Sequence, residues 1–106
     1  MFNFFNPGVF LPQISGKYLV NWSFNCVLIS GNAGQTYTAK VESNDFETFN
    51  FTPSTTSKHY NFQTIISTYG FSLSGDYGIY FTITSPENST IHLTSNIVNV
   101  SYVSKL

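Results

Sequence analysis

Apolar and polar residues alternate along most of the chain, and the longest alternating stretch begins at Tyr18. One phase of this stretch is apolar throughout, and its members are Tyr18, Val20, Trp22, Phe24, Cys26 and Leu28. Because the side chains of a β-strand point alternately to the two faces of a sheet, this pattern predicts a long strand with one buried face. Residues 31–34, Gly-Asn-Ala-Gly, predict a turn after it, since Gly and Asn accept positive φ.

Further strands are predicted by shorter alternating stretches that turn-forming residues separate. They cover residues 36–42, 49–51, 60–66, 77–83 and 97–103, and a short apolar stretch at 91–93 precedes the last one. We expect the strand over 36–42 to pair antiparallel with the first strand across the turn. Helical spacing of apolar residues is absent. Short strands at regular spacing predict an all-β fold, namely an antiparallel β-sandwich or barrel.

The first 14 residues differ from the rest, because their apolar residues do not alternate. Two prolines, Pro7 and Pro12, interrupt this segment. An apolar arm exposed to water is unfavourable, so we expect it to pack on its own domain or on a neighbouring protein. The sequence predicts an arm over residues 1–14 and one β-sandwich domain over 15–106, and removal of residues 2–11 is expected to release a partner and leave the fold intact. The expected anchoring residues are Phe2, Phe4, Phe5, Phe10 and Leu11.

Charged residues are scarce, with only 4 Lys+Arg and 5 Asp+Glu in 106 residues. Nucleic-acid binding depends on many contacts between Lys or Arg and phosphates, and membrane-surface helices are also basic. The composition therefore argues against both classes. The chain has no apolar run of about 18 residues that would predict a transmembrane helix, and its N-terminus lacks the basic region of a signal peptide.

Candidate catalytic residues are few. A hydrolytic triad would have to combine Asp76 with His59 or His92 and a serine, and no Gly-x-Ser-x-Gly motif marks a nucleophile. The two histidines are far apart in sequence, which makes a weak case for a metal site. We therefore expect a protein that is not an enzyme, with no cofactor and no metal. A hydrolase that uses Asp76 is the least favoured of three hypotheses.

Other residues of potential chemical interest also have ordinary structural explanations. Glu42, Asp45 and Glu47 lie near one turn but lack the ligand spacing of a calcium loop. Cys26 lies on the apolar phase of its strand, where a small buried hydrophobe is expected. Abundant aromatic, Asn and Gln residues also suit a carbohydrate-binding β-sandwich, whose exposed rings stack on sugars. Trp22, however, lies on the apolar phase, which favours a position in the core.

Several strands carry apolar residues on both phases, which predicts that a second sheet face is covered by another subunit. Leu19 opposes the Tyr18 phase, and Tyr80 opposes Ile79. In the last two strands the pattern leaves open which phase points inward. The residues expected at a subunit interface are Leu19, Asn21, Tyr80, Val100 and Tyr102.

Two stretches resemble the jelly-roll family of complement globular heads and tumour-necrosis-factor-like proteins. Residues 15–24, Ser-Gly-Lys-Tyr-Leu-Val-Asn-Trp-Ser-Phe, are similar to the family's Gly-x-Tyr-x-Val entry into an aromatic strand. Residues 73–80, Leu-Ser-Gly-Asp-Tyr-Gly-Ile-Tyr, are similar to its Gly-Asp corner. The resemblance covers about residues 15–103, and no counterpart of the family's first strand is recognised before Gly16. It implies a jelly-roll-like β-sandwich and a homotrimer in which one sheet of each protomer packs around a three-fold axis.

Versions of this module cap fibres and decorate capsids in viruses and phages. We therefore expect a non-enzymatic structural or attachment protein, namely a viral or phage minor capsid, fibre-head or decoration subunit located in the virion. Its expected partners are its own copies, other capsid or fibre proteins, and a glycan or protein receptor. The alternative is a carbohydrate-binding β-sandwich module, which predicts a row of exposed aromatic rings on one sheet or loop rim.

Overall fold

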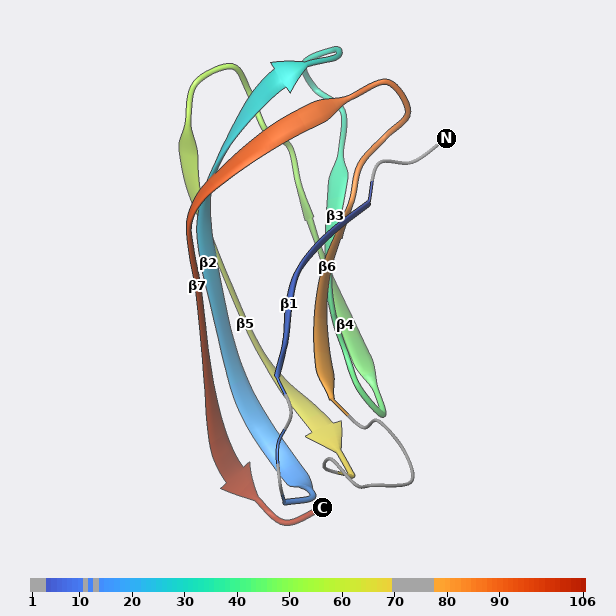
Figure 1. Ribbon diagram of the computed structural model, residues 1–106, viewed down its shortest axis with the longest axis vertical. Helices are drawn as coiled ribbons and strands as arrows, with labels where there is room; N and C mark the ends of the chain where they lie inside the picture. Colours follow the sequence, from blue (N-terminus) through green and yellow to red (C-terminus); the bar gives the residue numbers. More distant parts are fainter. Residues whose placement is uncertain (1–3, 11, 13, 70–77) are drawn as a thin grey trace.

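The computed structural model describes residues 4–10, 12, 14–69 and 78–106, and within them the protein is an antiparallel β-sandwich (Figure 1). One sheet has four strands in the order β1-β6-β3-β4, and the other has three in the order β5-β2-β7. The strands are β1 (Phe4–Phe10), β2 (Gly16–Ser30), β3 (Tyr37–Glu42), β4 (Phe46–Phe51), β5 (Lys58–Thr68), β6 (Ile79–Thr84) and β7 (Thr90–Ser104). The predicted fold class is confirmed. No helix in the described ranges could cross a membrane.

The core lies between the two sheets and is lined by alternate residues of the central strands. All six apolar-phase residues of β2 are buried, and Trp22 and Phe24 are fully covered. The facing sheet contributes Tyr37, Ala39 and Val41 from β3, together with the buried phase of β6. Period-two alternation in the sequence therefore reports the buried face of these strands directly, because each strand has one face on the core.

The connection after β2 crosses from one sheet to the other, so the predicted pairing of the first two long strands is wrong. Gly31 and Gly34 adopt φ values of 112° and 88°, as expected for a turn that needs positive φ. β3, however, pairs with β4 and β6, whereas β2 pairs with β5 and β7. Both edges of β2 are thus occupied by strands from distant parts of the chain, and no edge remains for β3.

The predicted N-terminal arm is not separate from the domain, because residues 4–10 form strand β1 of the four-stranded sheet. β1 pairs antiparallel with β6, from Phe4 opposite Thr84 to Phe10 opposite Ile79, and the register shifts between Phe5 and Gly8. Proline donates no backbone hydrogen bond and is tolerated at edge strands and bulges, which is where Pro7 lies. This irregularity hides the alternation that would have predicted a strand.

The last two apolar stretches belong to one strand, β7, which contains a β-bulge. Along β2 the partners step from Asn25 to Ser23, whereas along β7 they step by three residues, from Thr94 to Ile97. Ser95, inside this step, has a φ of 54° in the left-handed region. One extra residue exchanges the two faces of a strand. The core-facing phase therefore changes from Ile91 and Leu93 to Val98, Val100 and Tyr102.

The strand pairs are nested: each pair encloses the next one along the sequence, as in a long β-hairpin that folds over on itself. β3 pairs with β4, β2 with β5, and β1 with β6, and each pair is antiparallel. Nested pairs that wrap into two sheets are the plan of a jelly roll, which has eight strands in its complete form. In the described part of the chain β7 has no partner of this kind. Such a partner would precede β1 in the nested order.

Candidate subunit interface on the three-stranded sheet

The outer face of the sheet β5-β2-β7 carries the polar phase of β2 and the residues that pair with it. Opposite residues of antiparallel strands share a face, so the register defines this surface. We call it the amide face. Its members are Leu19, Asn21, Ser23, Asn25 and Val27 of β2, His59, Asn61, Gln63 and Ile65 of β5, and His92, Thr94, Ile97, Asn99 and Ser101 of β7. These positions include no Lys, Arg, Asp or Glu. Lys17 lies on the same side of the sheet, two residues before Leu19, at one end of the amide face.

Cross-strand hydrogen bonds join the side chains at the centre of the amide face. Asn61 donates from Nδ2 to Oδ1 of Asn21 over 2.9 Å. Nδ1 of His59 lies 2.9 Å from Oδ1 of Asn25 in a second hydrogen bond. Neutral amides that already have partners are much less costly to remove from water than charged groups. The polar residues of this face are therefore compatible with burial.

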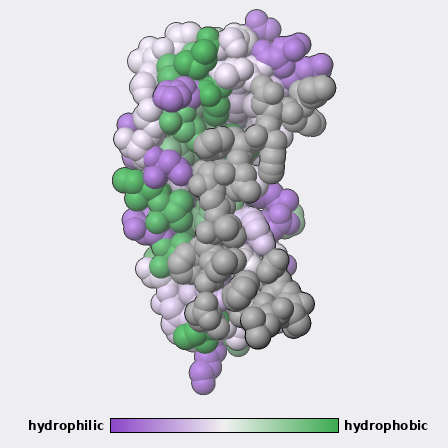
Figure 2. Space-filling model, viewed as in Figure 1, coloured by the Kyte–Doolittle hydropathy of each residue, from purple (hydrophilic) through white to green (hydrophobic). Residues whose placement is uncertain are grey.

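Apolar side chains flank the amide centre on both neighbouring strands. Ile65 of β5 and Ile97 of β7 are each 52% exposed, and Leu19 of β2 is half-buried. In Figure 2, hydrophobic and hydrophilic residues interleave along the left side of the molecule, over the three-stranded sheet. Interfaces between subunits combine apolar contacts with neutral hydrogen-bonding groups and are depleted in charge at their core. The amide face has this composition.

The outer face of the four-stranded sheet is different, because it carries charged residues. Nζ of Lys40 lies 3.3 Å from Oε1 of Glu42 and 4.9 Å from the centre of the Phe46 ring. The side chains of Lys40 and Glu42 are 37% and 48% exposed to water. Exposed ion pairs of this kind are typical of a solvated surface and add little to stability. Of the two outer faces, the amide face is therefore the better candidate for an interface.

The structure places the five predicted interface residues on three different surfaces. Leu19 and Asn21 lie together on the amide face, and Tyr80 lies on the outer face of the four-stranded sheet. Val100 and Tyr102 belong to the core-facing phase of β7, opposite Val20 and Tyr18 of β2. Val100 and Tyr102 face the core because the bulge in β7 exchanges the two faces of the strand. Sequence reasoning missed the members of the amide face from β5, since only the register shows which of their phases lies beside Asn21.

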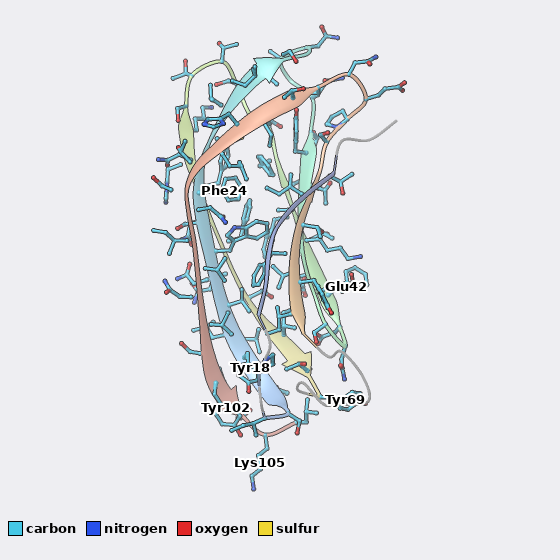
Figure 3. The ribbon with its side chains drawn as sticks, viewed as in Figure 1. Tyr18, Phe24, Glu42, Tyr69, Tyr102 and Lys105 are labelled. Carbon is cyan, nitrogen blue, oxygen red and sulfur yellow. The ribbon has the colours of Figure 1, made fainter. Side chains whose placement is uncertain are left out.

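Tyr102 packs at the end of the sandwich on core residues of β2. Its ring meets that of Tyr18 edge-on, with centroids 5.6 Å apart and an interplanar angle of 78° (Figure 3). Gly16 leaves the room for this contact, because a Cβ atom there would lie 2.6 Å from Cε1 of Tyr102. The Gly-x-Tyr pattern at the start of β2 therefore has a packing role in this protein.

Exposed aromatic rings are scattered over separate elements in the described residues. Phe46 is 58% exposed on the outer face of the four-stranded sheet, Tyr69 is 61% exposed after β5, and Tyr102 is 48% exposed on β7. Trp22 is fully buried, which confirms its predicted place in the core. The described rings therefore do not form the row that the carbohydrate-binding hypothesis predicts.

The residues considered for catalysis or metal binding are not gathered into a site where the structure describes them. No group of three or more His, Cys, Asp or Glu that could hold a metal occurs in the described ranges, and Asp76 lies outside them. His59 and His92 lie on the amide face. Asp45 accepts a hydrogen bond at Oδ1 from the backbone N–H of Ser67 over 3.0 Å, so it ties the turn after β3 to β5.

Only three of the five predicted anchoring residues of the N-terminal segment lie among the described residues. Phe4, Phe5 and Phe10 belong to strand β1, whose backbone pairs with β6 in the same chain. Phe2 and Leu11 lie outside the described residues. The segment from 4 to 10 is therefore part of the sandwich, and its place there is explained by pairing within this chain.

Cys26 is a buried thiol with suppressed reactivity. It is fully covered in the core, and burial raises its pKa to about 11. We expect its alkylation at pH 8.5 to be slower in the folded protein than in denaturant by about a hundredfold or more, because the thiolate is the nucleophile. Iodoacetamide labelling followed by mass spectrometry measures both rates. Equal rates would contradict the buried position.

Stability should depend on this thiol at high pH. In the unfolded chain the thiol ionises near its ordinary pKa, whereas in the folded chain it stays neutral up to about pH 11. The unfolded state therefore loses its proton first, and the contribution of the neutral thiol to the free energy of unfolding is lost as the pH rises from about 9 toward 11.

In comparisons with known proteins, no protein-family model matches the chain, and no curated protein matches it in sequence.

Proposed function

We propose that the protein is a non-enzymatic structural or attachment subunit that assembles as a homotrimer through its amide face. The observation that carries the proposal is the contrast between the two outer faces of the sandwich. One face bears a water-accessible ion pair, whereas the amide face includes no Lys, Arg, Asp or Glu and carries exposed isoleucines. Burying a neutral face against a copy of itself leaves no unpaired charge.

The low total charge of the chain supports assembly on physical grounds. The formal net charge is −1 at pH 7, so electrostatic repulsion between copies is small. Stable homo-oligomer interfaces bury about 2,000 Å² or more in total and resemble a domain core. A sheet face with long strands and few charges offers a broad, regular surface for such contact, and closed cyclic symmetry prevents open-ended growth from it.

We further propose that the trimer belongs to a virion, as a minor capsid, fibre-head or decoration subunit. Two observations support this role: the nested strand order of a jelly roll, and the resemblance of residues 15–103 to jelly-roll modules that cap fibres and decorate capsids. The partners in this role are neighbouring capsid or fibre proteins and a glycan or protein receptor on a surface.

Replacement of Asn21 by Lys tests the trimer. Asn21 lies at the centre of the amide face, opposite Gln63 of β5 and Asn99 of β7, so Asn21→Lys would place three charges around the axis. We expect the wild-type protein to show a three-fold mass by light scattering at micromolar concentration. The variant should show the monomer mass with an unchanged circular dichroism spectrum, because an unpaired buried charge is strongly destabilising.

Thr82→Lys is the matched control, since Thr82 lies on the outer face of the four-stranded sheet. This variant should remain trimeric. A monomeric wild-type protein, or equal dissociation of both variants, would refute the proposed interface. A monomer that binds glycans on an array would instead support the carbohydrate-binding alternative.

A further inference from the structure

The outer edge of β7 has no partner strand among the described residues. The other six strands form three complete nested pairs. β7 pairs with β2 on one side, and no described strand pairs with its other side. Backbone N–H and C=O groups along such an edge are free to pair with another strand. The three nested pairs of the fold are all antiparallel, so a further strand that continued this pattern would run antiparallel to β7.

Core-facing side chains of β7 are incompletely covered along this edge. Val100 is half-buried although its partner on β2, Val20, is fully buried. Tyr102 is 48% exposed although its partner Tyr18 is only 6% exposed. A strand added beyond β7 would extend the sheet and cover these apolar side chains, which favours its binding.

The edge also lacks the features that protect free strand edges from other chains. Such edges usually carry Lys, Pro or inward-pointing charges. β7, from Thr90 to Ser104, contains no Lys, Arg, Asp, Glu, Pro or Gly. At the opposite edge of the same sheet, β5 begins with Lys58, and its Phe62 ring stacks on Phe49 of β4 with ring centroids 4.6 Å apart. The uncharged β7 edge therefore has no side chain that would repel a second copy of itself.

The segment after the bulge is complementary to itself. Residues 97–103, Ile-Val-Asn-Val-Ser-Tyr-Val, alternate between the two faces around Val100. In an antiparallel arrangement centred on Val100, Val98 lies opposite Tyr102 on the core side, and Asn99 lies opposite Ser101 on the outer side. The residues of both pairs then share a face, as antiparallel pairing requires, and no charges oppose one another.

We infer that residues 97–103 of β7 pair antiparallel with the same segment of a second copy, around a two-fold axis at Val100. The contact joins two three-stranded sheets edge to edge into one six-stranded sheet. It uses the strand edge and leaves the amide face free, so it does not depend on the proposed trimer. Two-fold contacts of this kind would link trimers into a larger shell or array.

Cross-linking of Val100→Cys tests the pairing in the full-length chain. The two-fold axis brings both Cys side chains together, so a short bis-maleimide should convert most of the variant into a covalent dimer of doubled mass on a denaturing gel. Thr82→Cys is the control, because Thr82 is a β-branched, half-buried residue on the outer face of the other sheet. The control should remain monomeric on the gel. Cys26 is buried and contributes little background.

A double variant distinguishes the β7 contact from the trimer contact. Val100→Cys combined with Asn21→Lys should still give the covalent dimer even when light scattering shows that the trimer is lost. The inference is refuted if Val100→Cys reacts with a single-ended maleimide and yields no more dimer than Thr82→Cys.

Hydrogen exchange of the wild-type protein provides a second test that needs no variant. Pairing on both sides of β7 should protect consecutive amides over residues 97–103, because both edges of the strand then make hydrogen bonds. If the edge is free, every second amide in this segment exchanges rapidly, and that pattern would also refute the contact.

Discussion

Replacing Trp22 by Ala should lower the free energy of unfolding by about 3–5 kcal/mol, the usual cost of truncating a large buried aromatic residue. Trp22 is fully buried and contacts three other rings, with centroid distances of 5.4 Å to Phe24, 6.2 Å to Phe62 and 5.5 Å to Phe81. These rings come from three strands of both sheets. Because the total stability of a small domain is about 5–15 kcal/mol, this loss would remove a large share of it.

The Trp22 side chain also stabilises the β-bulge in β7 through a hydrogen bond. Its Nε1 donates a hydrogen bond to Oδ1 of Asn96 over 2.7 Å, next to Ser95 with its positive φ. Trp22→Phe keeps most of the apolar volume but loses this bond, so it should be less destabilising than Trp22→Ala. Both variants lose the hydrogen bond, so the difference between them measures the packing of the ring, whereas Trp22→Phe measures the hydrogen bond together with a smaller loss of volume.

Urea denaturation followed by circular dichroism measures these changes, since the variants lack the only tryptophan. Phe46→Ala is the control, because the Phe46 ring is 58% exposed and contacts Lys40 on the outer face. Its effect should stay within about 1 kcal/mol. Equal midpoints for Trp22→Ala and Phe46→Ala would contradict the position of Trp22 in the core.

Removal of residues 2–11 should prevent stable folding, in contrast to the expectation from sequence that this segment is a dispensable arm. The deletion removes strand β1 and exposes the edge of β6, whose residues Ile79, Phe81 and Ile83 are all buried. A free β6 edge presents unpaired backbone groups and favours aggregation. We expect loss of the cooperative unfolding transition, and aggregation on size-exclusion chromatography.

A milder variant keeps this prediction testable if the deletion is not expressed. Val9→Pro removes one backbone N–H from β1 and fixes φ near −65° at a position opposite Tyr80, after the register shift. It should lower the urea midpoint, whereas Val9→Thr, which keeps the backbone N–H and a β-branched side chain, should lower it much less. A deletion variant that unfolds cooperatively at the wild-type midpoint would show that β1 does not contribute to the fold.

The sequence by itself determined the features that depend on local periodicity. The alternation from Tyr18 to Leu28 indicates a long half-buried strand, and it correctly places Trp22 and Cys26 in the core. The turn at 31–34 is also local, because Gly31 and Gly34 adopt positive φ there without the steric cost that a side chain would add. Together with the regular spacing of short strands, these signals are sufficient to predict an all-β sandwich.

Long-range pairing was decided only by the tertiary structure. Nothing in residues 36–42 shows that β3 crosses to the opposite sheet, because its alternation is the same whichever strand it pairs with. Strand β1 escaped detection since Pro7 and the register shift interrupt its pattern. In both cases the choice depends on which strand edges remain open after distant segments have packed.

Most of the candidate interface was likewise decided by the fold. Leu19 and Asn21 could be placed on one surface from the alternation of their own strand. Val100 and Tyr102 could not, because a single extra residue at the bulge exchanges the faces of β7. The amide face exists only because β5 and β7 flank β2, and it is the register between those strands that brings Asn61 and Asn99 beside Asn21. Periodicity reports which side of a strand is buried, whereas the partners of that strand are set by packing across the whole chain.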